Sequence, residues 1–172
     1  MYKFEPFFRV KVDRVIDGDT LVVSFYMGLG LWLHEQKVRL LGINAPEKTG
    51  ETKEQGLKVT AYLESLLKKA DDVIVRTDEG KKGKFGRFLV ILYGRIDGKW
   101  VNLNKRLVSV GAAREYMAAD ASDAKDVFDP PPADIERRVK VDEAMTESLV
   151  YLNTDKEVTA MLKIAREVLS AE

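Results

Sequence analysis

The chain has 172 residues, and its 28 Lys and Arg balance 28 Asp and Glu, so the formal net charge is zero. With 45% hydrophobic and 33% charged residues it can bury a core. No apolar run approaches the roughly 18 residues that a membrane helix requires, and no membrane partner is expected. The absence of cysteine excludes disulfides and thiolate metal sites, and the one histidine argues against zinc.

The charge is distributed unevenly along the chain. Residues 1–117 contain 21 Lys and Arg against 15 Asp and Glu, a net +6, whereas residues 118–172 contain 7 against 13, a net −6. The basic part suits a polyanionic partner, and the acidic part would repel one. Residues 1–6 lack the apolar stretch and cleavage site of a signal peptide, so a cytoplasmic protein is expected.

The N-terminal residues predict two strands joined by a turn. Phe7–Val15 alternates apolar and polar side chains, and Thr20–Tyr26 is rich in β-branched and aromatic residues. Between them, Ile16–Asp19 has the Gly and Asp residues that favour a turn. Met27–Leu33 is unusually apolar for a connection. It is either a hairpin tip folded onto the surface or a contact with a substrate or partner.

The middle of the chain combines a buried strand, a polar turn and a helix. Val38–Ile43 is the strand; Asn44 and Glu47 stand in the turn around Pro46 that follows it. Glu54–Lys69 has apolar residues close to helical spacing, which predicts an amphipathic helix.

The next segment predicts further strands and a short helix. Val73–Arg76 and Phe88–Tyr93 are expected strands, and Ile96–Lys99 is the turn of a hairpin. Asn104 is the expected N-cap of a short helix that ends at Gly111.

Five short strands, with a helix after the third and another near the end, predict an α+β fold, mainly β, built on a small closed barrel. The barrel domain is expected to cover residues 1–117. Residues 118–132 form the expected Pro-containing linker, and residues 133–172 an acidic helical extension with two apolar helix faces. These faces either pack against the barrel or mediate contact with a protein partner or a second copy.

Two oxygen-bearing side chains suggest a metal site. Asp19 and Asn44 supply hard oxygen ligands, and Ala45 can add its backbone carbonyl. Such a set suits Ca²⁺ or Mg²⁺ and no soft metal. The alternative is that Asp19 belongs to an ordinary turn.

Two arginines and a glutamate complete the chemistry. Arg39 and Arg87 are fork-shaped cations that can hold a phosphate and neutralise charge in a phosphoryl transition state. Glu47 can act as general base for an attacking water, or can position that water. Together with a metal, these groups meet the requirements of phosphodiester hydrolysis.

Three motifs resemble those of the staphylococcal nuclease (thermonuclease) family. They are Val15–Thr20, Arg39–Glu47 and Lys84–Arg87, and their order and spacing carry the resemblance over roughly residues 8–117. The resemblance implies an oligonucleotide-binding (OB-fold) five-stranded barrel with packed helices. It also implies Ca²⁺-dependent cleavage of DNA and RNA that leaves 3′-phosphate ends, with Mg²⁺ or Mn²⁺ as substitutes.

The resemblance assigns roles by motif position. Asp19 is similar to the family's metal-ligating aspartate, Arg39 and Arg87 to its two catalytic arginines, and Glu47 to its catalytic glutamate. Asn44 departs from the pattern, because the best-known members have a metal-binding aspartate there.

Three further residues are expected to contact substrate. Lys84 and Phe85 resemble the pair that flanks the terminal phosphate and sugar, with Phe85 replacing a more usual tyrosine. Tyr116 is the expected stacking aromatic.

The leading hypothesis is therefore an active metal-dependent nuclease. The alternative is a catalytically weak or silent barrel of the same family that binds nucleic acid or protein. Such silent domains usually lose the arginine and glutamate positions, whereas Arg39, Glu47 and Arg87 are present here.

Overall fold

The computed structural model describes residues 7–28, 30–82, 87–116, 127–129 and 133. Most of them belong to one compact unit, residues 1–26 and 33–131, and a second unit comprises residues 27–32 and 132–172. No helix in the described ranges is long and apolar enough to cross a membrane. Except for Ala133, the predicted helical extension lies outside the described residues.

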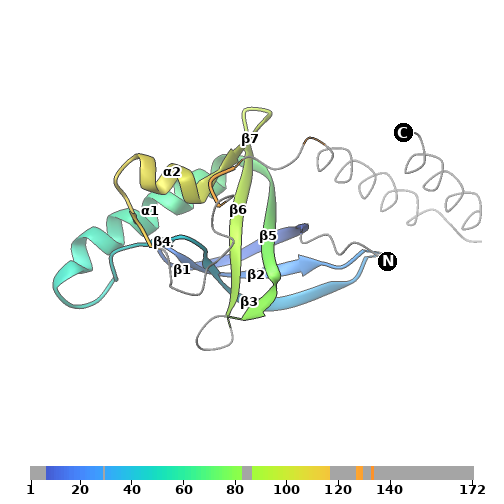
Figure 1. Cartoon of the computed structure of the whole chain (residues 1–172), viewed down its shortest axis with the longest axis horizontal. Helices are drawn as coiled ribbons and strands as arrows, with labels where there is room; N and C mark the ends of the chain where they lie inside the picture. Colours follow the sequence, from blue (N-terminus) through green and yellow to red (C-terminus); the bar gives the residue numbers. More distant parts are fainter. Residues whose placement is uncertain (1–6, 29, 83–86, 117–126, 130–132, 134–172) are drawn as a thin grey trace, which may run out of the picture. The chain divides into compact units, whose positions relative to one another are not determined.

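Five strands of the first unit close into a barrel (Figure 1). Their order is β3-β2-β1-β5-β6, and a parallel pairing of β3 with β6 closes the ring. The strands are β1 (Phe7–Asp17), β2 (Thr20–Tyr26), β3 (Trp32–Leu40), β5 (Ala70–Lys82) and β6 (Phe88–Ile96). This confirms the predicted mainly β fold, and closure removes the edges that such short strands would otherwise expose.

A hairpin adds β7 (Lys99–Asn102) beyond β6. Its turn residues Asp97 and Gly98 have φ values of 52° and 72°. These positive values match a type I′ turn, whose twist suits the flanking strands. The predicted hairpin turn is therefore confirmed.

Helix α1 (Lys53–Lys69) follows a short 3-10 helix, η1 (Gly50–Thr52), and supplies one wall of the core. Its buried residues follow helical spacing: Gly56, Val59, Thr60, Leu63 and Leu66. They pack with inward residues of β2 such as Leu21 and Val23. The predicted amphipathic helix is confirmed within one residue at its start.

Helix α2 (Leu103–Ser109) begins two residues earlier than predicted. Its N-cap is Asn102, whose side chain accepts a hydrogen bond from the backbone N–H three residues on (3.0 Å). The expected cap, Asn104, is instead fully buried. Its side chain accepts from the Leu92 N–H (3.0 Å) and donates to the Leu41 carbonyl (2.8 Å). Asn104 thus ties β6 to the turn after β3, because buried polar groups require such partners.

A separate two-stranded sheet lies beside the barrel strands. In it, β4 (Ile43–Asn44) pairs antiparallel with β8 (Arg114–Glu115). A short piece of the predicted linker also packs on this unit, since Val127 is fully buried and Asn102 donates to the Val127 carbonyl (2.8 Å). The predicted domain boundary at residue 117 stays a prediction.

The apolar connection between β2 and β3 forms a tight turn. The Met27 N–H donates to the Leu31 carbonyl (2.8 Å), and the Leu31 N–H donates to the Gly28 carbonyl (2.9 Å). Met27 and Leu31 are exposed, at 53% and 64%. Both interpretations of this connection, surface tip and binding contact, stay open.

Candidate active site

The turn between β1 and β2 places a carboxylate against the barrel end. The Asp19 N–H donates to Asp17 Oδ1 (3.1 Å), a local bond that shapes the turn. Gly18 is needed here for space: a Cβ on it would lie 2.5 Å from Val59 Cγ1 and 2.7 Å from Ala45 Cβ. Its φ is not positive, so glycine is required here by close packing against Val59 of α1 and against Ala45, and not by a left-handed backbone conformation.

The Asp19 carboxylate is buried and accepts three hydrogen bonds. Oδ2 accepts from the Ala45 N–H (2.8 Å), and Oδ1 accepts from Thr20 Oγ1 (3.0 Å) and from Arg39 Nη1. Burial raises the pKa of Asp19 above its usual value, while the Ala45 N–H and the Arg39 charge act in the opposite direction. The desolvation of the carboxylate therefore raises its pKa by more than its hydrogen-bond donors lower it.

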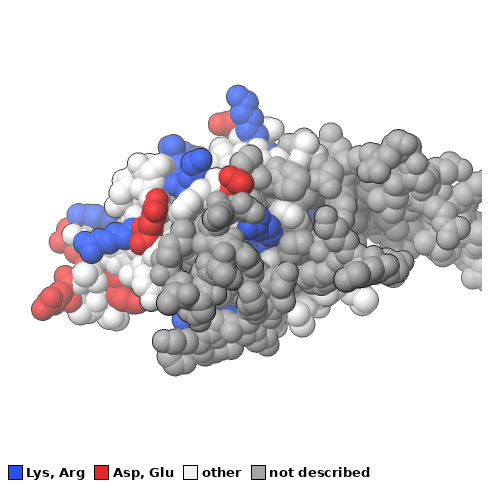
Figure 2. All heavy atoms as spheres, viewed as in Figure 1, with Lys and Arg blue, Asp and Glu red and all other residues white. Residues whose placement is uncertain are grey.

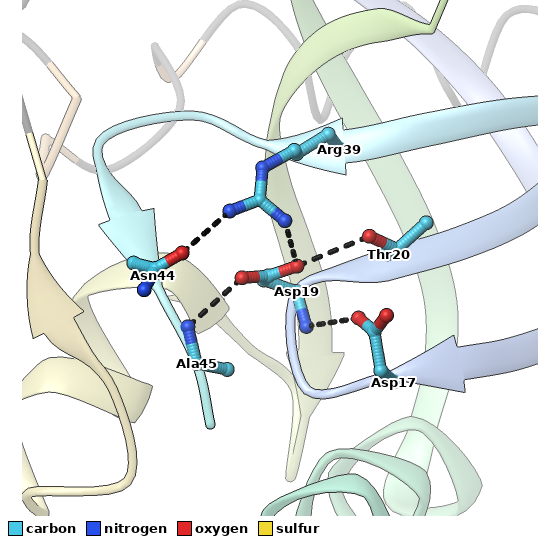
Figure 3. A network of polar contacts seen from close by, with 6 residues as sticks. All are labelled: Asp17, Asp19, Thr20, Arg39, Asn44 and Ala45. Carbon is cyan, nitrogen blue, oxygen red and sulfur yellow. Dashed lines mark hydrogen bonds and ion pairs between the residues drawn. The ribbon is translucent and has the colours of Figure 1, made fainter. Parts of the chain in front are cut away.

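Arg39 joins this carboxylate to the turn after β3. Its guanidinium donates from Nη1 to Asp19 Oδ1 and from Nη2 to Asn44 Oδ1 (2.8 Å). Figure 3 shows the fork lying between the two side chains. The two residues predicted as metal ligands are thus brought together, and the cation that bridges them in this structure is an arginine.

A glycine turn produces this arrangement. Gly42 has φ 74°, a left-handed conformation that L side chains rarely adopt, and it redirects the chain from β3 into β4. Asn44 therefore returns toward Arg39, five residues earlier. Tyr116 lies near this turn, because its N–H donates to the Gly42 carbonyl (2.9 Å), and its side chain is exposed.

The second predicted arginine lies one residue before β6, the strand that pairs with the Arg39 strand β3. Phe88 pairs with Val38, and Leu89 pairs with Arg39, so Arg87 directly precedes the β3–β6 ladder. Paired residues of neighbouring strands share a face of the sheet, so Leu89, two residues after Arg87, lies on the face of Arg39. Arg87 is half-buried. Lys84 and Phe85 lie outside the described residues.

Glu47 is exposed at the start of the loop that leads into η1 and α1. Its carbonyl accepts from Thr52 Oγ1 (3.1 Å). A Cβ on Gly56 would lie 2.3 Å from the same carbonyl oxygen, so the loop packs directly on the first turns of α1. The backbone of Glu47 is therefore anchored while its carboxylate faces solvent.

The predicted metal ligands fit a hard cation in donor chemistry. Asp19, Asn44 and the Ala45 carbonyl offer oxygen only, the donor type that Ca²⁺ and Mg²⁺ prefer. The set has one negative charge, and Arg39 opposes it. No group of three or more His, Cys, Asp or Glu side chains able to hold a metal occurs among the described residues. The donor set therefore predicts weak cation binding.

Sequence reasoning missed two contributors to this site. Thr20 donates to Asp19, and its position directly after the aspartate in the turn motif was the available signal. Arg114 stands opposite Asn44 in the β4–β8 register, and no local pattern marked it.

The fold and the site together define a class of protein: a small five-stranded barrel whose turn ends hold a buried carboxylate, an arginine fork and an amide. Residues 37–129 match the family described as staphylococcal nuclease homologue, and the chain belongs to this family. The resemblance inferred from the three motifs is confirmed.

Two relatives are similar to this chain. Uncharacterized protein MJ1439 of Methanocaldococcus jannaschii is 32% identical over 128 residues, which cover 63% of this chain and 59% of the relative. Endonuclease YhcR of Bacillus subtilis (strain 168) is 30% identical over 114 residues, which cover 62% of this chain and 9% of the relative. The chain therefore spans less than two thirds of the length of either relative.

Proposed function

We propose that this chain is a Ca²⁺-dependent nuclease that hydrolyses phosphodiester bonds of DNA or RNA and leaves 3′-phosphate ends. The observation that carries the proposal is the Arg39 fork, which donates to both Asp19 and Asn44, with Arg87 directly before the strand that pairs with β3. Membership of the staphylococcal nuclease homologue family and similarity to a protein named endonuclease support it.

The two arginines would bind the phosphate. A guanidinium has five N–H donors, and the described residues use two of those on Arg39. The remaining donors can reach a phosphate while Asp19 and Asn44 keep the fork oriented. Arg87, directly before the neighbouring strand β6, would neutralise the charge that grows on the phosphoryl oxygens in the transition state.

Glu47 would act on the attacking water. The water oxygen forms a new bond to phosphorus, its proton passes to the Glu47 carboxylate, and the P–O5′ bond breaks. The leaving 5′ oxygen takes a proton from solvent, so the products are a 3′-phosphate and a 5′-hydroxyl. A bound Ca²⁺, held by Asp19, Asn44 and the Ala45 carbonyl, would supply further charge neutralisation.

Degradation of a labelled single-stranded DNA and RNA in Ca²⁺, Mg²⁺ or chelator tests the proposal. Cleavage is expected with Ca²⁺ and is expected to stop with chelator, and phosphatase treatment is expected to shift the product mobility. Arg39→Lys should lower the rate by about 10²–10³-fold, since a point charge cannot replace the fork. Arg106→Lys is the matched control, because Arg106 is an exposed α2 residue that donates to Tyr62. Equal rates for both variants would remove Arg39 from the mechanism.

A further inference from the structure

A cavity of about 570 Å³ opens beside the Arg39 network. Its walls come from the turn after β4, the first turns of α1, and the segment from the end of α2 to β8. Asn44 is part of both the Arg39 network and the cavity wall: its side chain accepts a hydrogen bond from Arg39, and the residue also lines the cavity. The cavity and the proposed site therefore share Asn44. Its volume lies within the range of small-ligand pockets.

Two cations line the cavity from different elements. Lys58 comes from α1 and Arg114 from β8, and Arg114 stands opposite Asn44 in the strand register. Arg114 is exposed, and the described residues give it no ion-pair partner. Lys58 pairs with Glu54 (2.7 Å), but both side chains are largely exposed, and such pairs on a helix surface are weak. Both cations are thus available to a bound anion.

The rest of the lining suits a base and sugar. Among the described residues that line the cavity none is acidic, and Gln55 and Asn44 provide amides for the polar edge of a base. The floor has small or apolar side chains, including Val59 and Ala112, which leave room for a flat ring. Cations, amides and an apolar floor together match the parts of a nucleotide.

Figure 2 shows how the charges of the described residues are distributed on one face. There, described basic and acidic side chains are interspersed.

We propose that this cavity is a nucleotide subsite: it binds one unpaired nucleotide of the substrate strand, next to the phosphate held by Arg39. Lys58 and Arg114 contact the phosphate of that nucleotide, and the amides contact its base. The inference rests on the proposed nuclease function. A base in a duplex is stacked and paired and cannot enter a pocket, so the subsite selects single-stranded segments.

Oligonucleotide binding in chelator, where cleavage is expected to be silent, tests the subsite. Fluorescence anisotropy of a labelled single-stranded tetranucleotide is measured for wild type, Lys58→Gln, Arg114→Gln and the control Lys68→Gln, an exposed lysine further along α1. Each subsite variant should weaken binding by about 3–10-fold and flatten the slope of log affinity against log salt by about 0.7. The three variants should change the affinity for a blunt duplex to the same extent.

The possible results separate the two proposals. If Lys58→Gln and Arg114→Gln match Lys68→Gln in both affinity and salt slope, the subsite is overturned even if the wild type cleaves nucleic acid. If both variants weaken binding as expected but the wild type cleaves nothing in Ca²⁺, the subsite stands and the nuclease proposal fails. A wild type that binds no oligonucleotide in chelator overturns the subsite, and cleavage in Ca²⁺ then decides the nuclease proposal by itself.

Discussion

Replacement of Asp19 by alanine should destabilise the barrel even without metal. The Asp19 side chain is 4% exposed and accepts from Arg39, Thr20 and the Ala45 N–H. Without it, the Ala45 N–H and one side of the Arg39 fork lose their acceptor in a buried place. Breaking a buried ion pair by removal of one partner costs about 3–5 kcal/mol.

The lower end of that range applies to Asp19. Burial raises its pKa, which means that its three donors do not fully offset the desolvation of the carboxylate. The variant escapes that desolvation cost, so we expect a loss of about 3 kcal/mol. For a domain of this size, such a loss corresponds to a drop in Tm of roughly 10 °C.

Thermal unfolding in chelator measures this loss without a contribution from metal binding. Asp17→Ala is the matched control: it removes a carboxylate two residues away that, among the described residues, accepts the Asp19 N–H (3.1 Å) and no other hydrogen bond. It should cost about 1 kcal/mol or less. The double variant Asp19→Ala, Arg39→Ala should lose less than the sum of the singles, since the unpaired guanidinium is removed too. A Tm for Asp19→Ala equal to that of Asp17→Ala would refute the reasoning.

Three further predictions follow from the same contacts. Asn44→Asp should tighten Ca²⁺ binding by about tenfold in calorimetry, because affinity in oxygen sites follows ligand charge; unchanged affinity would show that residue 44 is not a ligand. Gly42→Ala should cost about 2 kcal/mol or more in thermal unfolding, since the φ is 74° and a Cβ would lie 2.8 Å from Val127 Cγ1. Gly98→Ala is its control, because Gly98 has φ 72° but no atom lies within 4 Å of a Cβ built on it. It should lose only the stability that the strained backbone costs, and equal losses for the two glycine variants would contradict the packing argument. Truncation after Met117 should lower stability by about 3 kcal/mol relative to truncation after Asp129, because it removes fully buried Val127 and the acceptors of the Asn102 amide; equal Tm values would show that this segment contributes nothing.

The sequence by itself determined the elements whose signals are local. The alternation of Phe7–Val15, the β-branched run Thr20–Tyr26 and the helical spacing of Glu54–Lys69 each predicted an element that the structure contains. The hairpin turn at Asp97 and Gly98 was equally local, because its residues alone favour positive φ. The motif order also pointed to the family.

The tertiary structure alone decided what those elements place together. Asn104 had the local chemistry of an N-cap, but the barrel buries it against Leu92 and Leu41, and Asn102 caps the helix instead. The sequence did not distinguish the two asparagines because either side-chain amide can cap a helix or bridge two buried backbone groups. Long-range packing determines which role each one takes.

The same limit applies to the site itself. Sequence spacing marked Asp19 and Asn44 as oxygen donors, yet the Arg39 fork that joins them depends on a turn at Gly42 and on contact between segments about twenty residues apart. Likewise, Arg114 lines the cavity beside Asn44 only because β8 pairs with β4. Local sequence specifies which groups are available, and strand pairing and close packing decide which of them meet.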